Sequence, residues 1–239
     1  MNIVIPMAGK GIRFHSAGYS VPKPLIPIQD KPMIQQAVDS VGQKGNYIFI
    51  IQNNPKIKDT LKSIYPTSNV IPIDYITEGP ASTCLLAKEY INNDQPLLII
   101  NCDQIMWWNA EAFSVFSNTC HYDGLIVTYT ESTPKNSYAK LNRRGHVVRI
   151  VEKEVISNVS LNGIHFWKKG SDFVISAEMM MIKNERYNNE FYVGPTYNYL
   201  IEQNKKIGIY HIPNEQHHAV GTPEDLLKYT NKVYDHENI

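Results

Sequence analysis

Two cations follow a small-residue turn near the start of the chain, and their types suit a phosphate ligand. The apolar run at 3–5 leads into the turn at 8–11, Arg13 comes next, and Lys23 lies between two prolines. Glycines let the backbone approach a ligand closely and expose its N–H groups. Arginine makes forked contacts with phosphate oxygens, whereas lysine acts as a point charge. The segment predicts a phosphate-binding loop formed by Ala8, Gly9, Gly11, Arg13 and Lys23.

The glycine spacing of this loop excludes two common nucleotide-binding motifs. No Gly-Lys-Ser/Thr sequence follows, so the loop is not a P-loop, and Phe14 occupies the position of the third glycine in a dinucleotide fingerprint. An ordinary strand-to-helix turn with surface cations is the alternative interpretation.

Asp103 is the second candidate for chemistry. It follows the fully apolar segment 97–100, separated from it by Asn101 and Cys102. A carboxylate at the carboxyl end of a buried strand contributes little to folding, but it is well placed to hold Mg²⁺ between phosphates. We therefore predict that Asp103 is a metal ligand; a capping acid after a strand is the alternative.

These residues need a scaffold, and the first half of the chain alternates between apolar runs and amphipathic segments. Continuous apolar strands separated by helices indicate a parallel sheet covered on both faces, and ligands bind outside the carboxyl ends of such strands. The expected strands are 3–5, 47–51, 70–76 and 97–100, and the expected helices are 31–41, 57–64 and 81–91.

The strands of the second half are expected to be more antiparallel. A turn at 142–145 separates two short strands, and Thr222 with Asp225 forms a capping pattern that starts the last helix. We predict a single α/β domain over 1–239, a Rossmann-like three-layer core with a mixed, mainly parallel sheet. Its nucleotide-binding half is 1–105 and its acceptor-binding half 106–239. The expected elements here are strands 122–130, 139–142, 147–151 and 207–212 and helices 171–184 and 195–203.

Composition narrows the classes of partner. The 239 residues are 43% hydrophobic, and 23 basic residues balance 23 acidic ones. Scattered basic residues and zero net charge argue against nucleic acid and anionic membranes. Three cysteines without metal-type spacing predict reduced, mostly buried thiols. With no signal-peptide pattern and no apolar run of about 20 residues, a cytoplasmic location is expected.

The segments "MAGKGIRF", "PKPLIPI" and "KPMI" together resemble the opening of the sugar-1-phosphate nucleotidyltransferases. This resemblance implies a Rossmann-like core and transfer of a nucleotidyl group from an NTP to a phosphate monoester, with Mg²⁺ and release of pyrophosphate. It also implies that Gly9, Gly11 and Arg13 hold the NTP phosphates. Lys23 would stabilise charge during transfer, and Asp103 would bind the metal.

The same resemblance extends to other segments. "TEGPAST" at 77–83 is similar to the family's base-binding turn, which implies that Glu78, Gly79 and Ser82 contact the nucleotide. An ordinary helix N-terminus is the alternative there.

"VEKEVIS" at 151–157 matches the family's acceptor-binding Glu-Lys pair, so Glu152 and Lys153 would contact the acceptor and its phosphate. A solvated charge run is the alternative. Asn162 and Gly163 are further acceptor candidates, and Ser137 and Tyr138 are expected near the same pocket. Trp107 and Trp108 are expected to pack.

One position departs from the family pattern. Many relatives carry a second metal-binding aspartate two residues before a late Gly-Thr, and here that residue is Ala219. His217, His218 and Asp225 are possible substitutes, but surface histidines and a helix-capping acid are the simpler interpretations.

The resemblance implies nucleotidyl transfer to a sugar-1-phosphate or similar acceptor, with a role in surface polysaccharide or capsule synthesis. It also implies a homo-oligomer. Three alternatives stay open. They are a cytidylyltransferase acting on a non-sugar phosphate, a glycosyltransferase of the same core fold, and a non-catalytic nucleotide-binding relative.

Overall fold

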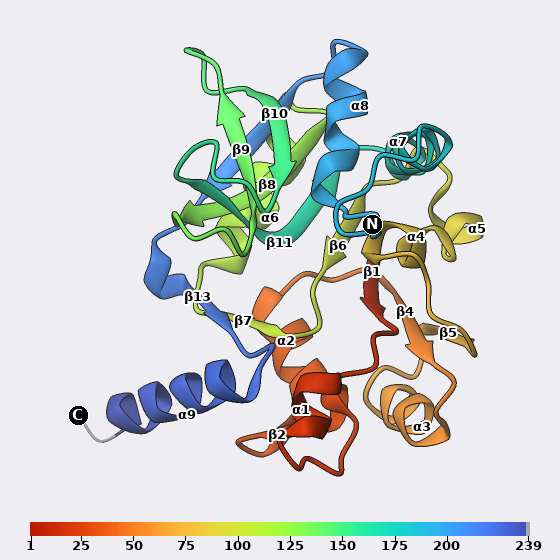
Figure 1. Ribbon diagram of the computed structural model, residues 1–239, viewed down its shortest axis with the longest axis vertical. Coiled ribbons are helices and arrows are strands. Elements are labelled where there is room, and N and C mark those ends of the chain that lie inside the picture. The colour runs from red at the N-terminus through yellow and green to blue at the C-terminus, as the bar shows by residue number, and fades with distance from the viewer. Residues whose placement is uncertain (238–239) are drawn as a thin grey trace.

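The computed structural model describes residues 1–237, and within them nine strands form one central sheet (Figure 1). β5, β4, β1 and β6 are parallel neighbours, and β11 pairs antiparallel with β6, β8 and β9. β12 runs parallel to β8, and β10 is antiparallel to β9. In this sheet, β10 and β11 therefore run against the other seven, which confirms the mixed, mainly parallel sheet. The strands are β1 (Asn2–Met7), β4 (Asn46–Gln52), β5 (Asn69–Ile73), β6 (Leu97–Ile100), β8 (Gly124–Thr130), β9 (Ser137–Leu141), β10 (Val147–Glu152), β11 (Val159–Trp167) and β12 (Ile207–His211).

Helices cover both faces because the central strands are apolar on both sides. Along β1, Ile3 and Ile5 enter one hydrophobic cluster and Val4 enters another, as the period-2 geometry of a strand requires. The first cluster packs against α2 (Met33–Val41), α3 (Pro55–Ile64) and α6 (Ala110–Thr119). The second packs against α4 (Pro80–Leu85), α5 (Lys88–Ile91), α7 (Gly170–Ile182) and α8 (Tyr197–Glu202). The result is the predicted three-layer core.

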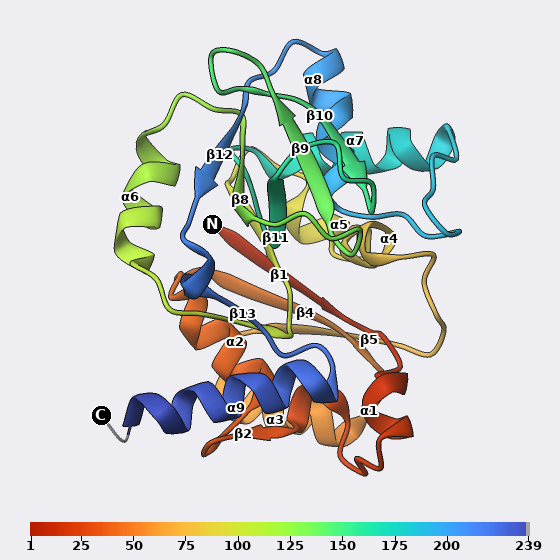
Figure 2. The ribbon, with the colours of Figure 1, turned by 60° about the vertical axis from the view of Figure 1, so that its left-hand side comes forward.

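A smaller third cluster brings the two ends of the chain together. Phe14 of α1 (Ile12–Ser16) joins Leu226 and Tyr229 of α9 (Pro223–Glu237) in it. Figure 2 shows α9 crossing beside α1 below the sheet. β7 (Gln104–Met106) pairs there with β13 (His217–Ala219). Short elements complete the chain: β2 (Pro27–Ile28), β3 (Lys31–Pro32) and 3₁₀ turns at Lys23–Leu25, Gly194–Thr196 and Asn214–Gln216.

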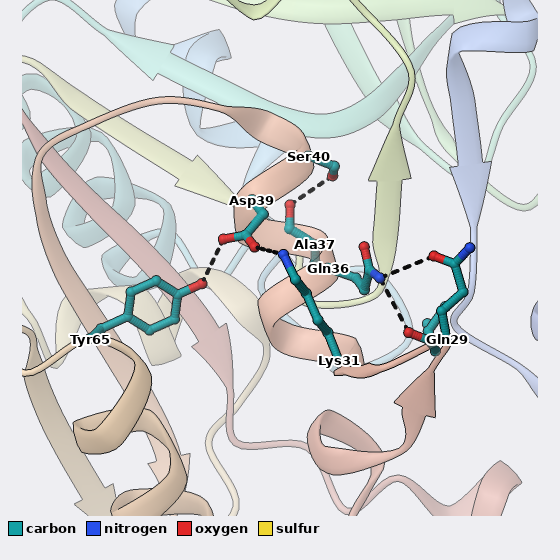
Figure 3. A network of polar contacts seen from close by, with 8 residues as sticks. Gln29, Lys31, Gln36, Ala37, Asp39, Ser40 and Tyr65 are labelled. Carbon is teal, nitrogen blue, oxygen red and sulfur yellow. Dashed lines mark hydrogen bonds and ion pairs between the residues drawn. The ribbon is translucent and has the colours of Figure 1, made fainter.

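Helix α2 is held in place by polar contacts along its length (Figure 3). Asp39 accepts from Lys31 at 2.8 Å and from the Tyr65 hydroxyl at 3.4 Å. At the other side, Gln36 donates to the Gln29 side chain at 3.3 Å and to the Ile28 carbonyl.

Ser40 of α2 donates to the Ala37 carbonyl and accepts from the Met106 backbone N–H at 3.0 Å. The Trp108 indole donates to the Ser40 carbonyl. These bonds fix β7, and therefore the chain directly after Asp103, against α2.

Three local differences from the sequence-based expectation have physical causes. The helix expected at 81–91 is broken after α4, because the Leu86 and Ala87 N–H groups bond three residues back instead of four. The strand expected at 70–76 ends at Ile73. Helix α6 and strand β11 were not expected; α6 begins at the Asn109 cap, which accepts from the Ala112 N–H.

Two expectations from composition can be compared with the structure. The three cysteines are free thiols, but only Cys84 is fully buried, while Cys102 and Cys120 are partly exposed. Over residues 1–237, no helix has the length and apolar character needed to cross a bilayer.

Candidate active site

Two cavities meet at the carboxyl end of β6. One has a volume of about 360 Å³ and contacts the glycine loop, and the other has a volume of about 300 Å³ and lies toward β9 and β11. Asn101, Asp103 and Pro80 line both. Any molecules in the two cavities would therefore meet beside the Asp103 carboxylate.

The first cavity, here called the loop cavity, is formed around the end of β1. Ala8, Gly9 and Gly11 line it, and the Ala8 carbonyl accepts from Gln52 Nε2 at 2.6 Å. A Cβ at Gly11 would lie 3.0 Å from the Lys23 Cβ, so glycine leaves room for the lysine. Arg13 is exposed on α1 and does not line either cavity.

Lys23 and Asp103 form an ion pair between these two cavities. The Lys23 Nζ lies 2.5 Å from Asp103 Oδ2, and their side chains are 18% and 28% exposed. Burial alone would lower the pKa of Lys23, but the Asp103 carboxylate and its hydrogen bond outweigh burial and raise that pKa above its ordinary value. Lys23 is therefore a fixed cation near neutral pH.

The surroundings of Asp103 fit a hard divalent cation. A Cβ at Gly221 would lie 2.9 Å from Asp103 Oδ2, so the absence of a side chain there keeps one side of the carboxylate open. Among residues 1–237, no three His, Cys, Asp or Glu side chains cluster as a complete metal site. Mg²⁺ commonly takes one or two carboxylates and fills its other positions with water and substrate phosphates, which one aspartate satisfies.

The turn at 77–83 contributes to the loop cavity through residues other than those expected. Thr77, Gly79 and Thr83 line it, and Gly79 has φ +124°, a conformation suited to glycine. Glu78 instead points to Arg186, whose Nη2 lies 2.9 Å from Glu78 Oε1. Ser82 donates to the Gly79 carbonyl and does not line the cavity.

The second cavity, here called the polar cavity, contains the buried carboxylate of Glu152. Glu152 is 6% exposed and accepts a short hydrogen bond from the Ser137 hydroxyl. Burial raises the pKa of Glu152 above its ordinary value, against the effects of Ser137 and of Lys153.

Lys153 lies beside the polar cavity instead of lining it. Its Nζ, outside the lining, donates to the Tyr192 hydroxyl at 2.5 Å and lies 3.9 Å from Glu152 Oε1. The ammonium also lies 4.3 Å from the centre of the Tyr192 ring and 5.4 Å from that of Tyr187. Of the charge run at 152–154, Glu152 thus lines the polar cavity and Lys153 lies beside it.

A bulge in β11 shapes the wall of the polar cavity. Its pairing with β8 shifts register between Leu161 and His165, and Gly163 has φ +94° within that interval. Asn162 is buried, and its Oδ1 accepts from the Ile164 N–H at 3.0 Å. A Cβ at Gly163 would lie 2.1 Å from Asn101 Nδ2, so a side chain there would displace Asn101.

The expectation of surface histidines at 217 and 218 is wrong. Both belong to β13, where His218 is buried and His217 lines the polar cavity beside Tyr129 at a ring distance of 4.5 Å. Burial, with His218 nearby, lowers the pKa of His217 to about 4. Ala219 also lines this cavity.

The other secondary candidates have structural roles. Thr222 caps α9, because its Oγ1 accepts from the Asp225 N–H, and the Asp225 carboxylate supports this cap by accepting from the Thr222 hydroxyl at 2.7 Å. Trp108 packs on Phe113 and Tyr210, and Trp107 packs on His218.

Sequence reasoning missed several residues of the polar cavity. Gln104 is adjacent to Asp103 and could have been found from that position alone. His165 lies in the same segment as the candidates Asn162 and Gly163 but was not singled out there, whereas Tyr192 comes from a segment with no visible motif.

Comparison with known proteins identifies the family. The nucleotidyl transferase family model matches residues 3–236, so the chain belongs to this family, which confirms the resemblance. The chain is 27% identical to the bifunctional protein GlmU of Methanocaldococcus jannaschii, over 100% of this chain and 55% of the relative. It is 26% identical to a mannose-1-phosphate guanyltransferase of Gibberella zeae, over 65% of this chain and 45% of the relative. The chain thus spans about half the length of these curated relatives.

A solved structure shows the same fold over nearly the whole chain. The nucleoside-diphosphate-sugar pyrophosphorylase of Vibrio cholerae RC9 superposes with a TM-score of 0.85 at 22% identity, covering 96% of this chain and 99% of that one. At that identity the likeness supports the fold alone.

Proposed function

We propose that the protein transfers a nucleotidyl group from an NTP to a small phosphorylated acceptor and releases pyrophosphate. The observation that carries this proposal is the Lys23–Asp103 ion pair, with its 2.5 Å separation, at the meeting point of the loop and polar cavities. Transfer between two anionic phosphates faces strong repulsion, and fixed charges at the point of contact lower that barrier.

The two cavities correspond to two substrates. The loop cavity is lined by residues from the first 105 positions together with Glu190, which suits the proposed nucleotide-binding half. Most of the polar cavity is lined by residues after 105, which suits the acceptor-binding half. The NTP phosphates lie against Gly9 and Gly11, and the acceptor phosphate approaches Asp103 from the polar cavity.

The chemical step then needs no protein base. An oxygen of the acceptor phosphate attacks the α-phosphorus, the bond to the β-phosphate breaks, and pyrophosphate leaves with the electron pair. The attacking phosphate is already anionic, so the side chains act by positioning and by charge neutralisation. Lys23 neutralises charge at the transferred group. Arg13 lies on α1 next to the loop, outside the lining of both cavities, and its proposed role is to bind the outer NTP phosphates.

Asp103 is the residue that would hold Mg²⁺, which supplies charge neutralisation on the phosphates when bound. Glu152 orients the acceptor, and Lys153 attracts its phosphate from beside the cavity. Asn162 and Gly163 shape the wall. In the turn at 77–83, Gly79 approaches the nucleotide base, and Glu78 and Ser82 support the turn.

The acceptor is proposed to be a sugar phosphate, since the matched relatives carry names of that kind. A product of this type would serve polysaccharide synthesis. A cytidylyl specificity and a homo-oligomer are further parts of the hypothesis.

The test is acceptor-dependent release of pyrophosphate. The purified protein is incubated with Mg²⁺, with CTP, UTP, dTTP, GTP or ATP, and with sugar-1-phosphates or non-sugar phosphates. One NTP should support release, and Lys23→Ala and Asp103→Ala should each reduce it by about 100- to 1000-fold. Release that is independent of acceptor, or unchanged in both variants, would contradict the proposal.

A further inference from the structure

Two buried polar side chains in the polar cavity have atoms without a hydrogen-bond partner. Gln104 is 2% exposed and its Nε2 has no partner, and His165 is 6% exposed and its Nδ1 has none. Both residues line the polar cavity. A buried donor left unpaired is costly, so such groups in a native cavity point to a ligand that completes them.

The fold holds both groups in place. Gln104 begins β7, which pairs with β13 and is bonded to α2 through Met106 and Ser40. His165 follows the β11 bulge and pairs with Ile99 of β6 and Ile126 of β8. The backbone of both residues is therefore held by strand pairing at the cavity wall.

The charges around the cavity indicate what kind of ligand it suits. Asp103 is paired with Lys23, and Glu152 is paired with Lys153 and Ser137. Lys135 also lines the wall. The acids of the lining thus already have cationic partners, whereas the unpaired atoms belong to an amide and an imidazole. An amide N–H and an imidazole nitrogen can each form a hydrogen bond with an oxygen atom of a ligand.

We infer that Gln104 and His165 determine acceptor specificity by hydrogen-bonding oxygen atoms of the acceptor. The site therefore selects phosphates that carry hydroxyl or carbonyl groups over alkylammonium phosphates. This inference rests on the proposed function, since it assigns the polar cavity to the acceptor. It adds two residues to the candidate site: Gln104, which follows Asp103 in the sequence, and His165, which is distant from it in the sequence.

Two matched glutamine variants separate a specificity role from a structural one. Gln104→Met removes an unpaired amide, so the free protein should unfold at the same or a higher temperature, while the acceptor KM rises roughly 10- to 100-fold. Gln43 is equally buried, but its Nε2 donates to the Ala110 carbonyl at 2.8 Å outside both cavities. Gln43→Met should lower the unfolding temperature and leave the acceptor KM unchanged.

The acceptors in the assay are glucose-1-phosphate, mannose-1-phosphate, their deoxy analogues and phosphocholine. The wild type should prefer a sugar phosphate, and one deoxy analogue should have the same KM with wild type and Gln104→Met, because the lost partner is already absent. His165→Phe should raise the acceptor KM in the same direction, with the NTP KM unchanged.

The outcomes distinguish this inference from the proposed function. Turnover with an unchanged acceptor KM in Gln104→Met and His165→Phe, or a preference for phosphocholine, overturns the inference and leaves nucleotidyl transfer standing. A loss of unfolding temperature in Gln104→Met equal to that in Gln43→Met also overturns it. If no acceptor turns over, the proposed function fails. The role of Gln104 is then tested by the unfolding temperature: sugar phosphates should raise it for the wild type but not for Gln104→Met, and equal shifts would overturn the inference.

Discussion

At the scale of single residues, the site is defined by how its cations are held. Lys23 is fixed by Asp103, while Lys153 is held by the Tyr192 hydroxyl at 2.5 Å and the faces of two tyrosines. Tyr192 in turn donates to Glu190, which lines the loop cavity. One tyrosine thus connects the cation beside the polar cavity with an acid of the loop cavity.

This arrangement predicts the effect of removing the Tyr192 hydroxyl. Tyr192→Phe keeps the ring under Lys153 but loses both hydrogen bonds, so we expect a KM for the acceptor about 5- to 10-fold higher and an almost unchanged NTP KM. Steady-state kinetics with each substrate varied measure the two constants.

The matched control is Tyr187→Phe, because Tyr187 contacts Lys153 through its ring at 5.4 Å. It should leave both constants close to the wild-type values. Equal effects of the two substitutions would show that the Tyr192 hydroxyl does not position Lys153.

At the scale of elements, the end of β6 and the segment after β13 meet at Asp103. The Val220 N–H donates to the Asp103 carbonyl at 2.9 Å, and Gly221 lies against its carboxylate. The position of the carboxylate therefore depends on a segment more than 110 residues later in the chain.

A methyl group at this contact should move the carboxylate without unfolding the protein. In Gly221→Ala the new Cβ would lie 2.9 Å from Asp103 Oδ2, so the carboxylate must shift. Displacements of about 1 Å can cost up to about 100-fold in rate, and we expect kcat to fall by about 10- to 100-fold.

Gly145→Ala in the β9–β10 turn is the control. Gly145 has φ +78° and open space around it, so alanine there should cost about 1 kcal/mol of stability and leave kcat unchanged. A normal kcat in Gly221→Ala would show that this contact does not position Asp103.

The local sequence predicts some of these elements well and others poorly. Continuous apolar runs identified β1, β4 and β6, because each of these strands is buried on both faces of the sheet. The break between α4 and α5 depends on two tightened hydrogen bonds. The segment of the β11 bulge supplied the candidates Asn162 and Gly163, but neither the strand nor its bulge was expected from the sequence. Of the candidate residues, Lys23 and Asp103 lie where the motif indicated, whereas Glu78, Ser82 and Lys153 point elsewhere. Their functional roles stay predictions.

At the scale of the whole molecule, buried histidines couple stability to pH. Burial lowers the pKa of His165 from 6.5 to about 3. The unfolded chain binds a proton near pH 6.5 while the folded chain does not, so the free energy of unfolding decreases as the pH falls from about 6.5 toward 3.

His165→Phe removes this titration. The free energy of unfolding of the variant relative to the wild type should therefore increase as the pH is lowered from 7.5 to 4.5, as measured by urea unfolding at several pH values. A difference that is constant over this range would contradict the assignment of a buried neutral imidazole.

The central claim is that the nucleotidyl group of an NTP moves to a phosphorylated acceptor beside the Lys23–Asp103 ion pair. The most direct measurement is a single turnover with α-³²P-labelled NTP and the acceptor that supports pyrophosphate release, followed by separation of the products. The account predicts that the label appears in a product containing the acceptor, in the same amount as pyrophosphate, and that Asp103→Ala forms almost none. Pyrophosphate release that leaves the label in free nucleoside monophosphate, with none in a product containing the acceptor, would contradict it.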